Sequence, residues 1–593
     1  MLKRGVPSFS YAHISLLLAG LMWVLPFLNY YHAYPLTTFY QEWGAAMLGL
    51  GALLLLVAGR CWLRPEIPRV ILLPLGLVLL VVVQFAMGKI AYFGQALLYS
   101  LYLSWAALLI MLGRQLRSEF GLAVLSTVLA AFLVVGGELS ALVGVLQHYR
   151  WHTFLDSVVT VKVSSAVYGN IAQPNHFADY LTLGLVSLGL LYARGSLRAW
   201  QVVVLALPLL YVLPLSGSRS TLLYLLCIAG MSYLWQRRDK SLSVLWHYSL
   251  LLLPAFGLMH LMVRLPWLAG STGDVTTIQR LFGEVNSEGI RLHLWHEAWL
   301  IFTRFPLFGA GFGQFAWQHF LLGPELRDAG MVGLYNNAHN LVMQLAAETG
   351  LAGLLVLFGT LLPWLWRARR AERSVYHWWG YSLLAVLGIH SLLEYPLWYA
   401  YFIGVAALLL GMFDSGCYRL ELRGLGRISV ALMLLLGVLS LQQLLHGYRN
   451  LEALMAQRPV SDNDTAYVER MRSGLREVRG LVLLQPYADL FIDSTLAVGP
   501  DHIEDKLTYN TEVLHFVPIS GVAYRQALLL AQAGDAAAAQ AQMGRAIWSY
   551  PGDFPATGKE LEGLVHRDPA RFAALLKFAI LKNEEYWRAV HGK

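Results

Sequence analysis

Residues 70–88 read VILLPLGLVLLVVVQFAMG, a run of 19 positions without a charged side chain. A helix gains ~1.5 Å per residue, so a run of this length can cross the ~30 Å hydrocarbon core of a bilayer. Twelve further apolar segments of similar character lie at 12–30, 41–59, 92–113, 121–147, 176–193, 199–214, 218–235, 244–263, 339–366, 377–393, 396–413 and 428–447. The sequence therefore predicts an all-α fold, a polytopic membrane bundle of about thirteen helices.

The composition of the 593 residues agrees with this fold class. Hydrophobic residues make up 57% of the chain and charged residues only 13%, whereas soluble proteins carry about 25% charged residues. These values exclude an ordinary cytosolic enzyme and a disordered scaffold. The net charge of +8 comes mostly from basic residues in the expected cytoplasmic loops and not from a basic stripe of the kind found in nucleic-acid binders, so no nucleic-acid partner is expected.

The basic residues predict the orientation of the chain in the membrane. With a cytoplasmic N-terminus, the cytoplasmic loops receive 19 basic residues and the outer face nine, and every cytoplasmic loop contains at least two. This is the positive-inside pattern of membrane proteins. The first apolar run lacks a small-residue cleavage site, which favours a retained helix over a signal peptide. Two long segments, 264–338 and the C-terminal 448–593, then lie outside.

Charge also separates a membrane domain from a soluble one. Residues 448–593 carry a net charge of −2 and residues 1–447 a net charge of +10. We therefore expect a transmembrane domain at 1–447, including the outer loop 264–338, and a soluble helical domain at 448–593. Small and apolar residues at 521–548, around an Ala-Gly-Asp turn, are typical of a tetratricopeptide-type helix pair. A second pair is expected at 556–590, and a generic helical bundle explains the domain equally well.

Two segments near expected outer helix ends are unusually polar. Residues 169–179 read GNIAQPNHFAD, in which Gln173 precedes a proline and should be extended, and Asn175 could cap the next helix. Residues 216–220 read SGSRS, and the small residues around Arg219 leave backbone N–H groups open to an anion at a helix start. The plainer alternatives are a capped helix entry and an arginine that pairs with lipid phosphate.

Arginines recur at 280–304. Arg291 lies beside an apolar stripe on a segment that could rest on the membrane surface, the stripe being Ile290, Leu294, Ala298 and Ile301. A guanidinium binds phosphate through two parallel hydrogen bonds and keeps its charge. For Arg280 and Arg304, residue chemistry alone favours a solvated or lipid-facing charge.

Residues 335–348 read YNNAHNLVMQLAAE. Asn336 or Asn337 could cap the following helix and place His339 in its first turn. The positive end of the helix dipole disfavours imidazolium, so His339 should stay neutral and able to accept a proton. The alternative is a polar boundary residue without chemical function.

Residues 390–399 read HSLLEYPLWY. Pro396 should end the helix and leave Glu394 and Tyr395 in a short outer turn. An aromatic belt at the membrane interface is the alternative explanation for the tyrosines, but it does not explain the carboxylate.

One topology places five candidates on the same face: Gln173, Arg219, Arg291, His339 and Tyr395. Together they predict a site with a base and anion-holding arginines. The sequence has no acidic pair with metal-ligand spacing, zinc signature or Gly-Lys-Ser phosphate loop, so we expect neither metal nor cofactor. A transporter, the alternative from another class, would need ionisable residues along a mid-membrane path, and few exist, namely Glu138, Asp179 and His260.

In this order the segments resemble the O-antigen ligase/polymerase superfamily of bacterial inner membranes. Within it the chain is most similar to the PglL-type protein O-oligosaccharyltransferases. Residues 336–341 (NNAHNL) with 348–351 (ETGL) resemble the superfamily core motif, and 172–175 (AQPN) with 390–399 resemble the protein-glycosylating branch. The resemblance covers residues 165–415.

The resemblance implies transfer of a glycan from undecaprenyl pyrophosphate to a periplasmic acceptor. It implies an inner-membrane protein whose active face and C-terminal domain are periplasmic. His339 matches the essential histidine, and Arg219 and Arg291, with Arg280 as a third candidate, match the pyrophosphate-binding arginines. The expected substrate-binding or orienting residues are Gln173, Asn175, Asn337, Asn340, Glu394 and Tyr395.

The acceptor remains open at this stage. Ser or Thr hydroxyls of periplasmic proteins such as pilin are favoured, with the membrane lipid as a further partner. An O-antigen ligase acting on lipid A-core and a polymerase that joins glycan repeats are alternatives of the same chemistry. A lipid-linked glycan transporter is the alternative of a different class.

Overall fold

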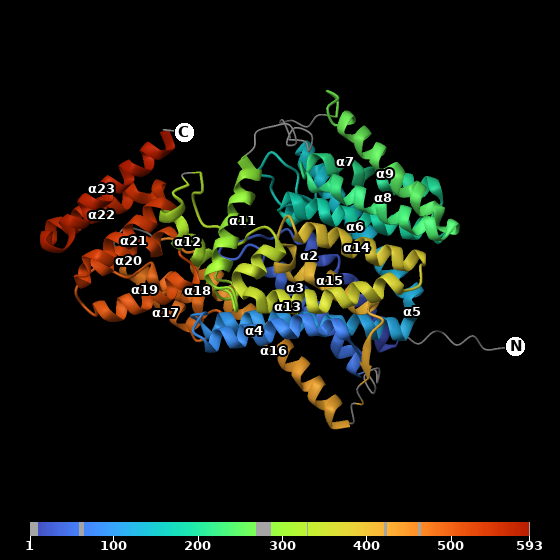
Figure 1. Ribbon diagram of the computed structural model, residues 1–593, viewed down its shortest axis with the longest axis horizontal. Coiled ribbons are helices and arrows are strands. Elements are labelled where there is room, and N and C mark those ends of the chain that lie inside the picture. Colours follow the sequence, from blue (N-terminus) through green and yellow to red (C-terminus); the bar gives the residue numbers. More distant parts are fainter. Residues whose placement is uncertain are drawn as a thin grey trace. The chain divides into compact units, whose positions relative to one another are not determined.

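The computed structural model describes residues 10–58, 65–268, 286–328, 330–419, 421, 424–459 and 464–591. The described chain is almost entirely helical (Figure 1), apart from one antiparallel pair of short strands, β1 (Glu66–Pro68) and β2 (Cys417–Arg419). The all-α class is therefore confirmed. The chain divides into two compact units, one formed by 1–75, 102–285 and 357–443 and the other by 76–101, 286–356 and 444–593.

The first unit contains a large apolar core. Its helices are α1 (Tyr11–Met22), α2 (Leu25–Leu28), α3 (Phe39–Ala58), α6 (Pro174–Ala193), α7 (Ala199–Leu215), α8 (Ser220–Arg238), α9 (Ser243–Met262), α14 (Val375–Ser391) and α15 (Ala400–Phe413). Short 3₁₀ turns are η1 (Arg69–Ile71), η2 (Asp156–Val158), η3 (Gly169–Ile171), η4 (Lys240–Leu242) and η5 (Pro396–Trp398). Four helices have residues in both units, namely α4 (Leu72–Ala86), α5 (Phe93–Tyr149), α13 (Leu341–Arg370) and α16 (Gly424–Met455).

Eight helical segments in the described chain are long and apolar enough to cross a membrane. They are 11–28, 39–58, 69–86, 93–149, 174–193, 240–262, 341–370 and 424–455, with shorter apolar helices at 199–215 and 400–413. All thirteen predicted segments are helical, and the runs 92–113 and 121–147 are joined in α5 across a break at Gly121. The chain is a polytopic membrane protein, while thirteen spans stay a prediction.

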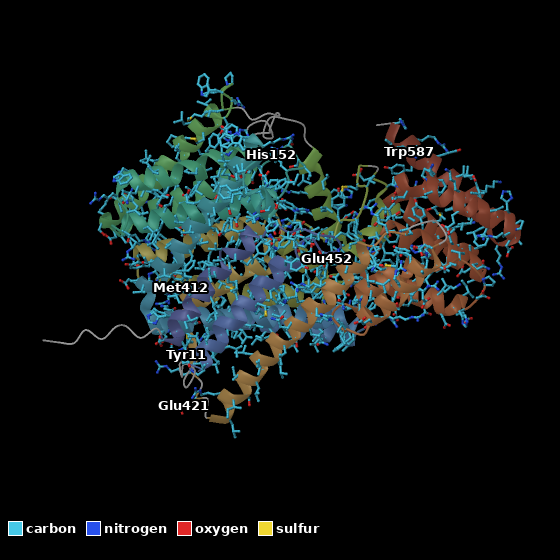
Figure 2. The ribbon with its side chains drawn as sticks, turned by 180° about the vertical axis from the view of Figure 1, so that it is seen from behind. Tyr11, His152, Met412, Glu421, Glu452 and Trp587 are labelled. Atoms are coloured by element: carbon cyan, nitrogen blue, oxygen red, sulfur yellow. The ribbon has the colours of Figure 1, made fainter. Side chains whose placement is uncertain are left out.

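Helix α6 is largely buried in the first unit, which fixes the position of its polar N-terminus. It packs against α7, α8, α9 and α14, and these helices surround it in Figure 1. Gly189 permits one such approach, because a Cβ there would meet the rings of Tyr248 and Trp378 at 2.7 and 2.9 Å. Met412 of α15 is fully buried, whereas His152, in the loop after α5, is exposed; both residues are labelled in Figure 2.

The second unit consists of α11 (Asn286–Arg304), α12 (Phe315–Leu326), α17 (Thr465–Arg479), α18 (Gln485–Asp493), α19 (Ile503–Phe516), α20 (Ser520–Ala533), α21 (Ala536–Ser549), η6 (Pro551–Asp553), α22 (Phe554–Arg567) and α23 (Pro569–His591). The predicted pair at 521–548 is present as α20 and α21. Gly534 turns the chain at φ 92°, and Asp535 caps the second helix through the N–H of Ala538 at 2.9 Å. The second predicted pair is α22 and α23. The domain boundary after residue 447 stays a prediction.

A glycine contact in the second unit holds the chain near the start of α13. Helix α13 breaks at Gly350, where φ is 63° and ψ −157°. A Cβ at Gly350 would lie 2.6 Å from the backbone nitrogen of Gly309, so there is no room for a side chain. The positive φ at this position also favours glycine. Segment 306–311 pairs with this break through Leu351 N–H to Pro306 O at 2.8 Å.

Candidate active site

The histidine segment leads into α13 and is held by its own amides. Asn340 Oδ1 accepts hydrogen bonds from the backbone N–H groups of residues 342 and 343, at 3.0 and 3.1 Å. Asn340 is therefore the helix cap. The predictions that Asn336 or Asn337 caps α13 and that His339 lies in its first turn are wrong, because the helix begins two residues later, at Leu341.

His339 has an unusual backbone conformation just before the helix. Its φ is 51°, in the left-handed region that non-glycine residues rarely adopt. Asn337 Oδ1 accepts from the His339 N–H at 2.8 Å, and Gln344 Oε1 accepts from the Ala338 N–H at 2.6 Å. These bonds fix the turn, while the imidazole itself is only partly buried. Strained backbone of this kind often occurs at functional sites.

Arg291 lies on helix α11 beside the predicted apolar stripe. The predicted apolar stripe is confirmed, since Leu294, Ala298 and Ile301 are buried among residues of α12 and α13. This face is covered by protein, and contact of the segment with the membrane surface stays a prediction. Arg291 itself is half-buried.

A carboxylate and two histidines that the sequence analysis did not select tie α11 to α12. Glu297 Oε1 lies 3.1 Å from His293 Nε2, and its Oε2 lies 2.8 Å from His319 Nδ1. His293 Nδ1 is 3.2 Å from Asp328, and the ring of His319 packs edge-on against Tyr335, at 5.4 Å between centroids. The network thus joins the helix of Arg291 to the irregular segment that leads to His339. The i,i+4 spacing of His293 and Glu297 was the available sequence signal.

The charge of Glu297 follows from these contacts. Burial alone would raise the pKa of this carboxyl, but hydrogen bonds from His293 and His319 outweigh it and leave the pKa lowered. The ionised carboxylate therefore stabilises the fold above the ordinary glutamate pKa of about 4.3, and the stabilisation is lost as pH falls through the lowered value.

Replacement of Glu297 by glutamine should destabilise the protein. Loss of hydrogen bonds to a charged group costs about 1.5–3 kcal/mol, so thermal unfolding in detergent at pH 7 should occur well below the wild-type temperature. The gap should shrink as the pH falls through the lowered pKa of Glu297, since the wild-type carboxylate is then neutralised. Glu325→Gln, in an exposed pair with Arg304, is the control and should change little. A pH-independent gap would contradict the assigned charge.

In the first unit, Gln173 rather than Asn175 caps the central helix. Gln173 is extended as predicted, with φ −141° and ψ 120°, and its Oε1 accepts from the His176 N–H at 2.5 Å. The prediction that Asn175 caps α6 is wrong. Its side-chain Nδ2 instead donates to Glu394 Oε1 at 2.7 Å. This bond joins the start of α6 to the turn after α14.

The turn at Pro396 forms as predicted. Helix α14 ends at Ser391, and Glu394 and Tyr395 precede the short turn η5. Glu394 is buried, and Tyr395 stacks against Tyr399 with 5.9 Å between ring centroids. Burial raises the pKa of the Tyr395 hydroxyl, which therefore remains protonated and able to donate a hydrogen bond.

Arg219 marks the start of α8. Gly217 turns the chain at φ 63°, and Arg219 occupies the position before the first helical residue, Ser220. The guanidinium-bearing side chain is half-buried, and α8 packs against α6 and α14. The three polar segments at 169–179, 216–220 and 390–399 therefore belong to three helices that contact one another.

The candidate site residues that the structure describes fall into two groups, one in each unit. The first unit holds Gln173, Asn175, Arg219, Glu394 and Tyr395, and the second holds Arg291, Asn337, His339 and Asn340. Arg280 lies outside the described residues. That both groups serve one substrate stays a prediction.

Comparison with known families covers both groups. Residues 203–358, with Arg219, Arg291 and His339, match the family model described as O-antigen ligase, and residues 378–561 match the C-terminal model of virulence factor membrane-bound polymerase. Residues 167–192, with Gln173 and Asn175, match the model described as protein glycosylation ligase. Together these matches support the O-antigen ligase/polymerase superfamily for this chain. Within this superfamily it resembles the PglL-type branch.

A relative with a matching name supports the same branch. The chain is 27% identical over 416 residues to the general O-oligosaccharyltransferase of Acinetobacter baylyi. The similarity covers 68% of this chain and 70% of the relative. The relative and the family models support a glycosyltransferase-type enzyme.

Proposed function

We propose that this membrane enzyme transfers an oligosaccharide en bloc from undecaprenyl pyrophosphate to Ser or Thr hydroxyls of periplasmic proteins, with pilin a candidate acceptor. One observation carries the proposal. The segment that matches the protein glycosylation ligase model contains Asn175, which donates to Glu394 in the turn beside Tyr395. Both predicted signatures of the protein-glycosylating branch thus belong to one hydrogen-bonded structure.

In the proposed mechanism, Arg219 and Arg291 bind the diphosphate of the donor. Guanidinium groups neutralise the phosphates and stabilise the negative charge that develops on the leaving group. Arg280 is a third candidate for this role. Divalent cations supply such charge in other phosphate chemistry, and in this proposal the arginines supply it.

His339 acts as the general base of this mechanism. Its imidazole accepts the proton of the acceptor hydroxyl as the hydroxyl oxygen bonds to the anomeric carbon, and the bond from that carbon to the phosphate oxygen breaks. Attack from the face opposite the leaving group inverts the anomeric centre. The products are the glycoprotein and undecaprenyl pyrophosphate, and His339 returns its proton to water. Asn337 and Asn340 orient the histidine turn, and Gln173, Asn175, Glu394 and Tyr395 bind or orient substrate.

This activity requires a periplasmic active face. We propose that the protein lies in the bacterial inner membrane with its N-terminus in the cytoplasm and its C-terminal domain in the periplasm. That domain could then dock a folded acceptor protein.

The second candidate function is an O-antigen ligase with lipid A-core as acceptor, which the match over 203–358 favours. Intact-mass analysis of periplasmic proteins and lipopolysaccharide, from cells with and without the gene, separates the two. Our proposal expects a protein that loses the mass of a whole glycan while lipopolysaccharide is unchanged. Loss of polymer from lipopolysaccharide with all proteins unchanged would establish the ligase instead.

A further inference from the structure

Next to the Tyr395 turn, three buried side chains from three helices form a hydrogen-bonded series. Tyr224 Oη of α8 is 2.8 Å from His390 Nδ1 of α14, and His390 Nε2 is 3.2 Å from His176 Nδ1 of α6. All three side chains are at most 1% exposed. Contacts this deep within a bundle require matched donors and acceptors.

At one end of this hydrogen-bonded series, the His176 ring contacts two tyrosine rings of the candidate site. The His176 ring meets Tyr395 and Tyr399 edge-on, with centroids 6.1 and 5.0 Å apart, and its backbone N–H is the one that Gln173 caps. His176 therefore contacts two of the residues that the family resemblance selects in this unit, Gln173 and Tyr395. A shift of its ring would change the contacts with Tyr395 and Tyr399, and a shift of its backbone would change the cap formed by Gln173.

The hydrogen-bond chemistry makes the three residues act together. The contact between two imidazole nitrogens requires that one carry a proton and the other a lone pair, so the tautomers of His176 and His390 are coupled. The hydroxyl of Tyr224 biases that choice at the far end. Removing the hydroxyl leaves a buried nitrogen of His390 without this partner, and the chain can rearrange toward Tyr395.

We infer that His176, His390 and Tyr224 are positioning residues for glycan transfer, acting through Tyr395 and Gln173. The inference rests on the proposed function for its catalytic readout. It assigns a role to His390 and Tyr224 although both side chains are fully buried. None of the three contacts the substrate.

Tyr224→Phe is the direct test, because it removes one hydroxyl and keeps the ring. With purified protein, lipid-linked donor and protein acceptor, kcat/KM should fall about tenfold relative to wild type, the loss expected for one buried hydrogen bond. Tyr248→Phe is the matched control. Its hydroxyl donates to Leu185 O of α6 at 2.6 Å, away from the histidine pair. Loss of this hydroxyl should leave kcat/KM within about twofold of wild type once folded protein is equalised.

A readout independent of activity separates this inference from the proposed function. In protein labelled with ¹⁵N-histidine, Tyr224→Phe should shift the imidazole nitrogen resonances of both His390 and His176, whereas Tyr248→Phe should shift neither. Wild-type activity in the same preparation tests the proposed function itself. Wild-type kcat/KM in Tyr224→Phe, an equal loss in the two variants, or unchanged histidine resonances in Tyr224→Phe would overturn the inference.

Discussion

His339→Ala should abolish detectable glycan transfer while the protein still folds and inserts. A general base typically contributes about 10²–10⁴-fold in rate, and the backbone contacts that shape this turn come from Asn337 and Gln344 rather than from the imidazole. The partly buried ring can be removed without opening an apolar core. The measurement is the intact mass of an acceptor protein after incubation with donor and purified enzyme.

The matched control for this variant is His152→Ala. His152 lies in the exposed loop after α5 and pairs only with the neighbouring Asp156 at 2.9 Å among the contacts described for it. Its removal should leave the transfer rate unchanged. Near-normal glycosylation by His339→Ala would refute the assignment of the base, whatever the control does.

Arg219→Lys and Arg291→Lys should each slow transfer by about tenfold or more, and the alanine variants by about 10²–10³-fold. Lysine keeps the positive charge but cannot form the two parallel hydrogen bonds of a guanidinium with phosphate. The loss should therefore appear in kcat/KM for the lipid-linked donor, while KM for the acceptor protein stays near the wild-type value.

Arg304→Lys provides the control for the arginine variants. Arg304 belongs to the same helix as Arg291 and pairs with Glu325 at 2.5 Å, but both side chains are exposed. Exposed pairs contribute about 0–1 kcal/mol, so this variant should be fully active. Equal effects of Arg291→Lys and Arg304→Lys would show that Arg291 has no special role in donor binding.

The sequence predicted those features that local chemistry decides. Apolar length identified the helices, and the prolines at 174 and 396 correctly marked an extended Gln173 and the end of α14. The stripe beside Arg291 was also predicted, because apolar residues at helical spacing mark one face of a helix whatever packs against that face.

Features that depend on distant partners could not be predicted in this way. Asn175 is turned toward Glu394, 219 positions away, so it leaves the cap to Gln173. Asn340 caps α13 because the helix begins at Leu341, while Asn337 accepts from the His339 N–H instead. His176 and His390 are 214 positions apart in the sequence, and no local sequence pattern predicts that they form a pair.

Purified enzyme in a defined reaction tests the central claim most directly. The reaction contains undecaprenyl-pyrophosphate-linked oligosaccharide, an acceptor protein with Ser and Thr residues, and EDTA. Our account predicts that the intact mass of the acceptor rises by one whole oligosaccharide, that undecaprenyl pyrophosphate is released, and that EDTA has no effect. An acceptor of unchanged mass, beside lipid A-core that gains the glycan in a parallel reaction, would contradict it.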